Sequence, residues 1–322
     1  MNESLKEIAR IGIVPVIILD NVNHAIPLAK ALRTGGINCA EITFRTQAAK
    51  ESIKAISQEL PQMLVGAGTI LTIQQVDEAI CAGAKFIVSP GLNPKIVRYC
   101  IEKDITIIPG CSSASNIETA LELGLDTVKF FPAESIGGIN MIKSLSAPYP
   151  NMNFMPTGGI NLKNISSYLS FKKVIACGGS WIASKELINK DDFTTITKLS
   201  KEAVSAILGF EVAHTCINSK DKSQVKETAD LFSNIFGFVK RETSSSVFAS
   251  EHLEIMEPPC HGTNGHIAIV TNSVERSLYH LTKKGVSFNY KTAKYDANNN
   301  IKFVYLEKEI NGFAIHLLQK SN

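Results

Sequence analysis

The sequence predicts an α/β protein in which a (β/α)₈ TIM barrel is followed by a smaller α+β domain. From Gly12 to about Gly179, eight short apolar runs typical of buried strands alternate with helix-like runs. After Gly209 the pattern changes to a more polar, strand-rich sequence that holds six of the seven histidines. The 322 residues are enough for two domains, which we expect at residues 1–209 and 210–322.

The eight strand-like runs cover residues 12–19, 39–45, 64–69, 86–91, 106–111, 127–133, 153–158 and 173–179. Between them lie helix signals: Asn93 is an expected N-cap with Pro94 at the first helical position, and Gly124 is an expected helix stop. Eight such units within about 200 residues favour a closed barrel. A doubly wound open sheet is the alternative, but it usually has fewer strands, and no G-x-G-x-x-G follows the first strand.

In the expected second domain, one order of elements occurs twice. A strand, a helix and two strands are followed by the same series, at residues 210–218, 223–237, 246–250, 253–259, 265–271, 274–285, 301–307 and 313–320. This order indicates an internal duplication with weak sequence identity.

Composition and charge narrow the class of protein. The net charge is +3, and basic and acidic residues are mixed, so no basic stripe suggests a nucleic-acid partner. No apolar run approaches the roughly 20 residues that cross a bilayer. Charged side chains in the first 20 residues argue against a signal peptide, so we expect a cytoplasmic protein with no membrane partner. The seven cysteines lack a C-x-x-C pair, and we expect them to be reduced core residues.

The run 39–45 carries three polar side chains on one face. Alternate side chains of a barrel strand face the interior, so Glu41, Thr43 and Arg45 are expected to point inward while Ile42 and Phe44 meet the helices. They lie toward the carboxyl end of the strand, where barrel active sites are found. A buried Glu–Arg ion pair that holds the barrel together is the structural alternative.

Lys129 lies inside an apolar run, on the same strand face as Thr127 and Phe131. An apolar lining disfavours the charged ammonium, and a nearby Arg45 would act in the same direction. A neutral amine is a nucleophile toward carbonyl carbons, usually in Schiff-base formation. The alternative is a lysine that extends from the strand end to water.

The last two strands of the expected barrel end in paired glycines, in the motifs 156–160 and 177–181. Glycine lets backbone N–H groups approach an anion, and barrels often hold phosphate at this location. Ser180 could add a hydroxyl donor. The two motifs together indicate a phosphate site.

Taken together, these residues resemble the family of 2-keto-3-deoxy-6-phosphogluconate aldolases, many of which also act on 4-hydroxy-2-oxoglutarate. The motifs VPVI, EITFRT, GAGT, SPG, KFFPAE, PTGGI and GGSW occur in family order between about Leu5 and Leu208. The resemblance implies a Schiff-base (class I) aldolase that needs no metal or other cofactor for the aldol step, takes small keto-acid substrates and assembles as a homotrimer.

The resemblance also implies roles for particular residues. Lys129 falls on the Schiff-base lysine and Glu41 on the proton-shuttling carboxylate, while the substrate-binding positions are Arg45, Thr69, Pro90, Phe131, Thr157, Gly158, Gly159, Gly179 and Ser180. The implied reaction cleaves the keto acid to pyruvate and either glyceraldehyde 3-phosphate or glyoxylate. The main rival is another phosphate-binding barrel, an isomerase or synthase, in which Lys129 is only a counter-ion.

The second domain carries four possible metal ligands in matching places of its two halves: His214, Glu254, His266 and His316. Imidazole and carboxylate suit Zn, Ni, Co, Mn or Fe. Isolated histidines in strands are more often hydrogen-bonded core residues, and His252, Glu257 and His261 lie close enough in sequence to confuse the assignment.

The element order and the motifs GHIAIV, LEIM and GFAIHLL resemble the glyoxalase or vicinal-oxygen-chelate superfamily, whose paired βαβββ modules commonly hold a divalent metal at these four positions. His316 stands where glyoxalases usually have Glu, so the glyoxalase reaction itself is not implied. Two roles are open for this domain. It could be a second enzyme that acts on an α-keto or enediol-forming sugar acid, or a non-catalytic binding or oligomerisation module.

Overall fold

The computed structural model describes residues 1–321, which form two compact units with the boundary after Ile207. Each unit has its own buried apolar residues. No helix among residues 1–321 is long and apolar enough to span a bilayer.

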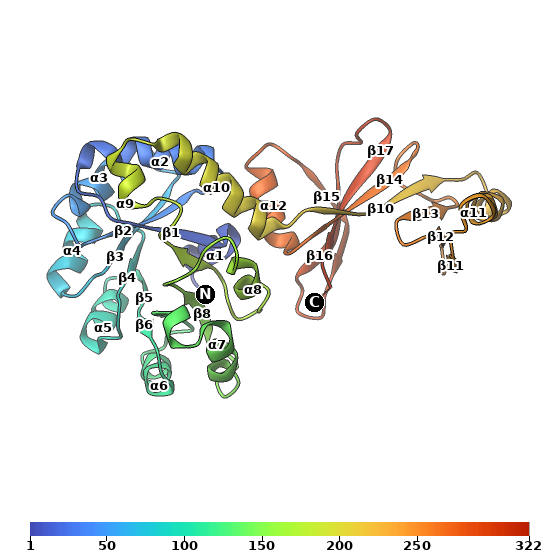
Figure 1. Cartoon of the computed structure of the whole chain (residues 1–322). Helices are drawn as coiled ribbons and strands as arrows, with labels where there is room; N and C mark the ends of the chain where they lie inside the picture. Colours follow the sequence, from blue (N-terminus) through green and yellow to red (C-terminus); the bar gives the residue numbers. More distant parts are fainter. Residues whose placement is uncertain (322) are drawn as a thin grey trace. The chain divides into compact units, whose positions relative to one another are not determined.

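Parallel strands form the centre of the first unit (Figure 1). They are β1 (Ile13–Ile17), β2 (Cys39–Thr43), β3 (Leu64–Gly68), β4 (Phe86–Val88), β5 (Thr106–Ile108), β6 (Gly110–Cys111), β7 (Thr127–Phe130), β8 (Asn153–Pro156) and β9 (Cys177–Gly179). One sheet has the order β5-β4-β3-β2-β1-β9 and another the order β6-β7-β8. Bridges from Phe154 to Val174 and from Thr157 to Gly178 join β8 to the β9 region, so the parallel pairing continues around the unit.

The predicted strand 106–111 is divided in two at Pro109, which separates β5 from β6. Proline has no N–H to donate to a neighbouring strand, so the ladder is interrupted there. The carbonyl of Pro109 still accepts a 2.9 Å hydrogen bond from the backbone N–H of Lys129. β5 and β6 together therefore occupy one strand position of the barrel, and each of the eight predicted runs contains a strand.

The helices of the first unit surround the strands in Figure 1. They are α1 (Glu3–Ile11), η1 (Val22–His24), α2 (Ala25–Thr34), α3 (Ala49–Glu59), α4 (Ile73–Cys81), α5 (Pro94–Glu102), α6 (Ala114–Glu122), η2 (Glu134–Ile136), α7 (Gly138–Ser146), α8 (Ile165–Leu169), α9 (Lys185–Asn189) and α10 (Phe193–Leu208). The side chain of Asn93 accepts from the N–H of Lys95, which confirms the predicted N-cap.

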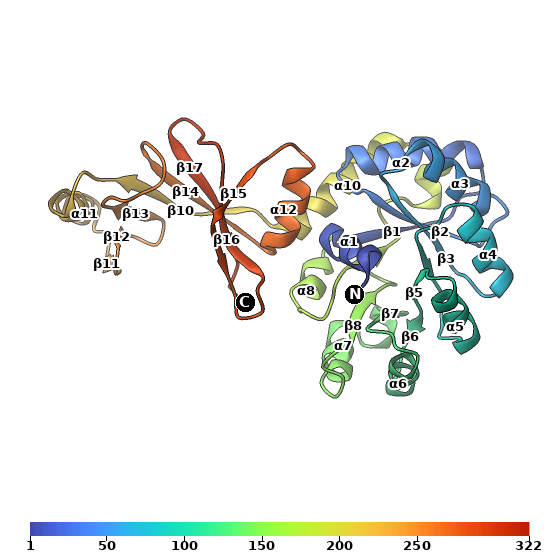
Figure 2. The same ribbon diagram turned by 180° about the vertical axis from the view of Figure 1, so that it is seen from behind.

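The start of α1 lies at the amino ends of the strands (Figure 2). The amide of Asn2 donates to the hydroxyl of Thr106, the first residue of β5, and Ser4 donates to the carbonyl of Lys85, just before β4. The α-amino group lies 2.8 Å from Asp126, just before β7. The N-terminal segment therefore occupies the amino ends of the strands, and a substrate-binding site is expected at their carboxyl ends.

The second unit is built on one mixed sheet with the order β11-β12-β13-β10-β14-β17-β16-β15. The first half contains β10 (Glu211–Asn218), α11 (Lys222–Phe236), β11 (Lys240–Glu242), β12 (Ser246–Ala249) and β13 (Leu253–Met256). The second half contains β14 (Gly265–Thr271), α12 (Val274–Thr282), β15 (Phe288–Tyr295), β16 (Ile301–Leu306) and β17 (Phe313–Gln319). The halves meet where β10 pairs with β14 in antiparallel orientation.

Each helix covers the sheet of its own half. On α11, Val225 and Ala229 pack against Ala249 and Ile255, while on α12, Val274 and Leu278 pack in a separate cluster with Phe288, Val304 and Leu317. The edge strands β11 and β15 were not predicted, because they are largely polar and exposed and lack the apolar alternation of a half-buried strand.

Candidate active site and candidate metal centre

Lys129 lies on β7 at the carboxyl end of the barrel strands, and only 6% of it is exposed. Its strand neighbours in register are Gly110 of β6 and Met155 of β8. Val128 and Phe130 are buried on the opposite face. The ammonium nitrogen lies 5.2 Å from the ring centroid of Phe131, which forms one apolar side of its surroundings.

Glu41 on β2 is the charged partner of Lys129. Its side chain is fully buried, and its Oε1 lies 3.6 Å from Nζ of Lys129. Neither carboxylate oxygen has a hydrogen-bond partner among residues 1–321. Gly68 of β3 makes room for this carboxylate, because a Cβ at residue 68 would lie 2.1 Å from Oε1 of Glu41. The predicted buried carboxylate is thus beside the lysine, and not paired with Arg45.

Arg45 and Thr69 follow the ends of neighbouring strands, β2 and β3. Nε of Arg45 donates to Oγ1 of Thr69 at 3.4 Å. Thr69 has φ of +58°, which is unfavourable for a β-branched residue. Such strain is maintained only where the surrounding structure imposes it, and it concentrates at functional sites. A guanidinium beside a hydroxyl can bind a carboxylate.

The two glycine motifs lie next to each other. Thr157 bridges to Gly178, which brings the turn at Gly158 and Gly159 beside Gly179 and the exposed Ser180. Gly158 and Gly159 have φ of +101° and +80°, values that L side chains rarely adopt. The buried hydroxyl of Thr157 has no hydrogen-bond partner among the described residues.

The remaining predicted residues lie close to these groups. Pro90 is beside β6, because a Cβ at Gly110 would lie 2.0 Å from the carbonyl oxygen of Pro90. A supporting contact was not predicted: the buried Tyr168 of α8 donates a short hydrogen bond to Glu134, which follows β7. Glu134 also packs under Gly159, where a Cβ would lie 2.6 Å from its side chain. Only tertiary structure brings Tyr168 to this turn, so no local sequence signal could have found it.

The first unit is therefore a parallel α/β barrel with a buried lysine–carboxylate pair and two glycine turns at the carboxyl ends of its strands. The chain belongs to the KDPG and KHG aldolase family, whose model matches residues 3–199. It is an enzyme of the carbon–carbon lyase class.

Known relatives cover the first unit almost from end to end. The chain is 48% identical to the 2-dehydro-3-deoxy-phosphogluconate aldolase of Treponema pallidum, over 62% of this chain and 94% of that protein. It is 42% identical to the KHG/KDPG aldolase of Escherichia coli K12, over 60% and 90%. The KDPG aldolase of Legionella pneumophila, solved with pyruvate captured as a covalent carbinolamine, superposes with a TM-score of 0.60 at 38% identity, over 62% of this chain and 97% of that one.

In the second unit, three of the predicted ligands converge. Oε2 of Glu254 lies 3.2 Å from Nε2 of His214 and 3.1 Å from Nε2 of His266, and the two imidazole nitrogens are 3.2 Å apart. His316 joins them, since His214, His266 and His316 each offer a ligand atom within 4.8 Å of the others. The four residues come from β10, β13, β14 and β17, two from each half.

Hydrogen bonding and burial shift the pKa values of two of these groups, Glu254 and His316. Burial raises the pKa of Glu254, but hydrogen bonds from His214, His266 and Ser246 outweigh it and hold that pKa well below its ordinary range. Burial, with the charges of His266 and His214, lowers the pKa of His316 to about 3. A carboxylate and neutral imidazoles are the forms that bind metals.

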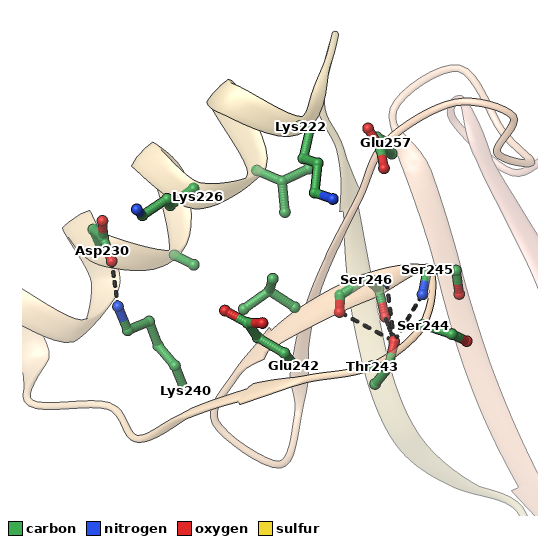
Figure 3. Close-up of a pocket in the computed structure, with 13 residues that line it drawn as sticks. Lys222, Lys226, Asp230, Lys240, Glu242, Thr243, Ser244, Ser245, Ser246 and Glu257 are labelled. Carbon is green, nitrogen blue, oxygen red and sulfur yellow. Dashed lines mark hydrogen bonds and ion pairs between the residues drawn. The ribbon is translucent and has the colours of Figure 1, made fainter.

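Three other candidates stay outside this cluster. Nδ1 of His252 lies 2.9 Å from the carbonyl oxygen of Ala213, and the ring of His261 packs at an angle of 39° against that of Tyr305, with centroids 4.3 Å apart. Glu257 lines a separate cavity of about 220 Å³ between α11 and the β11–β12 hairpin (Figure 3). Ser246 is the link between that cavity and the cluster, because its hydroxyl donates a 2.5 Å hydrogen bond to Oε1 of Glu254.

Proposed function

We propose that the barrel is a Schiff-base (class I) aldolase that cleaves 2-keto-3-deoxy-6-phosphogluconate, 4-hydroxy-2-oxoglutarate, or both. The observation that carries this proposal is the position of Lys129, a buried amine 3.6 Å from a buried carboxylate at the carboxyl ends of the strands. The relatives' names, and the carbinolamine captured in the Legionella enzyme, support the same chemistry.

The reaction begins when the neutral amine of Lys129 attacks the C2 carbonyl carbon of the keto acid. Glu41 transfers protons while the resulting carbinolamine loses water and becomes a protonated imine. Glu41 then removes the proton of the C4 hydroxyl, the C3–C4 bond breaks, and its electron pair moves into the imine to give an enamine. Reprotonation of C3 and hydrolysis release pyruvate, and the other product is glyceraldehyde 3-phosphate or glyoxylate.

We assign substrate binding to the groups around Lys129 and Glu41. The guanidinium of Arg45 and the hydroxyl of Thr69 hold the carboxylate of the keto acid. The backbone at Gly158, Gly159 and Gly179, with the hydroxyls of Thr157 and Ser180, holds the phosphate. Pro90 and Phe131 line the pocket between the carboxylate-binding groups and the phosphate-binding groups. This aldol chemistry requires no metal or other cofactor, and a homotrimer stays a prediction that sedimentation analysis would test.

Borohydride reduction in the presence of pyruvate tests the covalent step. We expect mass spectrometry to find a reduced pyruvate adduct on Lys129 in the wild type and none in Lys129→Met. A rival isomerase or synthase, in which Lys129 is only a counter-ion, predicts turnover without any adduct. Unmodified wild-type protein that still cleaves either keto acid would overturn the class I mechanism.

We also infer that the second unit consists of paired βαβββ modules of the glyoxalase or vicinal-oxygen-chelate type and holds a divalent metal at His214, Glu254, His266 and His316. Metal–ligand bonds of about 2.1 Å place neighbouring ligand atoms about 3.0–3.4 Å apart. The separations of 3.1, 3.2 and 3.2 Å among His214, Glu254 and His266 fit this requirement. Zn, Ni, Co, Mn and Fe(II) all accept such ligands.

A bound metal would act here as a Lewis acid toward substrate oxygens. The protein's own contribution is orientation, because Ser246 holds Oε1 of Glu254 and leaves Oε2 facing the imidazoles.

Elemental analysis of the full-length protein tests the proposed metal site. We expect close to one divalent metal per chain in the wild type and a large loss in His266→Ala, whereas a value near zero in gently purified wild type would contradict the site. Loss of barrel assembly on removal of residues 210–322 would favour a non-catalytic, structural role instead.

A further inference from the structure

Two cations flank the candidate metal centre, one from each half of the second unit. The guanidinium carbon of Arg241 lies 4.4 Å from the ring centroid of Phe248, and Nζ of Lys294 lies 5.0 Å from that of Phe303. Both cations are solvent-exposed, so they are accessible to a ligand in solution.

The two pairs occupy corresponding places in the sheet. Arg241 on the edge strand β11 is the register partner of Phe248 on β12, and Lys294 on the edge strand β15 is the register partner of Phe303 on β16. Register partners project from the same face of a sheet. Each cation is therefore on the same face as the ring beneath it.

The two aromatic rings connect the cations to the candidate ligands. The ring of Phe248 contacts the imidazole of His214, with centroids 5.5 Å apart, and the ring of Phe303 contacts that of His316 at 4.4 Å. The face that carries the cations is thus the face that carries the candidate metal centre.

The alternation of side chains along β11 also places Arg241 on the face that carries the candidate metal centre. Lys240 and Glu242 point toward α11 in Figure 3, and Lys240 is paired with Asp230 of that helix. Successive side chains of a strand project to opposite faces, so Arg241 projects to the other side. Among residues 1–321, neither Arg241 nor Lys294 makes an ion pair, so both positive charges are available to an anion.

We propose that this face binds a small organic dianion: a 2-oxo acid whose carboxylate and keto oxygens chelate the metal, and whose second anionic group is held by Arg241 or Lys294. The proposal rests on the metal centre inferred above. When the chelating end of such a ligand lies on the metal, its other anionic group can meet one of the two flanking cations, so each negative charge that leaves water meets a positive one. Both substrates proposed for the barrel belong to this chemical class, since each is a 2-oxo acid with a phosphate or a second carboxylate.

The test uses the full-length protein loaded with Co²⁺, whose visible absorption reports ligands that reach the metal. The variant Lys129→Met serves as background, so that no keto acid is bound covalently in the barrel. Each sample is titrated with 2-oxoglutarate and with 2-oxopentanoate, which has the same chain length and chelating end but lacks the second carboxylate.

We expect 2-oxoglutarate to bind about tenfold more tightly than 2-oxopentanoate, as for one charge-assisted contact. The double variant Arg241→Gln and Lys294→Gln should remove this preference and leave the affinity for 2-oxopentanoate unchanged. Lys302→Gln, on β16 next to Phe303, is the control for net charge and should keep the preference. Equal affinities in the background protein, or a preference that survives the double variant, would overturn the proposal. If no Co²⁺ spectrum develops, the metal centre itself fails, and the proposal fails with it.

Discussion

Nζ of Lys129 lies 3.6 Å from Oε1 of Glu41, and this carboxylate accepts no hydrogen bond from any residue in 1–321. Buried carboxylate oxygens are almost always hydrogen-bonded, so an unsatisfied pair of oxygens needs an explanation. A substrate hydroxyl or a water molecule that carries protons would provide the missing donors. Beside its ion pair with Lys129, this carboxylate can therefore still exchange a proton with such a donor, as the role proposed for Glu41 requires.

Replacement of Glu41 by Gln tests this role. The amide keeps the size of the side chain but cannot accept a proton, so we expect kcat for cleavage to fall about 10²–10⁴-fold. Circular dichroism should show an unchanged fold. A kcat within a few-fold of the wild type would contradict the assignment of Glu41 as the proton shuttle.

Gly68→Ala tests the space that Glu41 requires. The new Cβ would lie 2.1 Å from Oε1 of Glu41, so the carboxylate must move away from Lys129. We expect a loss of about 1–3 kcal/mol in the free energy of unfolding, together with a large fall in kcat. Gly91→Ala is the matched control for stability, because a Cβ there meets nothing within 4 Å. Equal behaviour of the two variants would count against the packing argument.

Arg45→Lys tests carboxylate recognition at the strained Thr69. Lysine keeps the positive charge but loses the planar fork that matches a carboxylate, so we expect KM for either keto acid to rise at least tenfold with a smaller change in kcat. Arg98→Lys, on the exposed surface of α5, is the control and should leave both constants unchanged. An unchanged KM in Arg45→Lys would exclude this residue from substrate binding.

Burial also predicts which cysteines react. It raises the pKa of Cys100 and Cys111 to about 12, and burial together with the nearby Glu254 and Cys260 raises that of Cys216 to about 12. The thiolate is the reactive form, so these three should resist iodoacetamide at pH 8. Peptide mapping of the folded protein should find Cys81 labelled first, because it is exposed. Early labelling of Cys111 would show that the barrel opens in solution.

The barrel could be predicted from the sequence because its strands are short, apolar and separated by clear helix signals. Glu41 and Lys129 could be assigned an inward direction from the alternation of strand side chains. Their mutual contact, the close fit of Gly68 and the hydrogen bond from Tyr168 to Glu134 depend on neighbouring strands and helices, and spacing along the chain carries no information about them.

In the second unit, too, some contacts between neighbouring strands could not be predicted from spacing along the chain. The matching places of His214, Glu254, His266 and His316 in the two halves did predict the residues that the structure brings together, but no local signal shows that His252 and His261 lie outside this cluster. The polar edge strands β11 and β15 give no periodic signal, so the placement of Arg241 over Phe248 appears only with the register. The expected cytoplasmic location and the absence of nucleic-acid partners stay predictions.

The pairing of β10 with β14 carries a consequence for how this sequence can change. Two candidate ligand positions come from each half, and the halves meet at this pair. A slip of one residue turns every side chain of a strand to the opposite face. A single inserted or deleted residue within β10 or β14 would therefore scatter the ligands, whereas insertions in the turns at the sheet's outer edges would leave them in place.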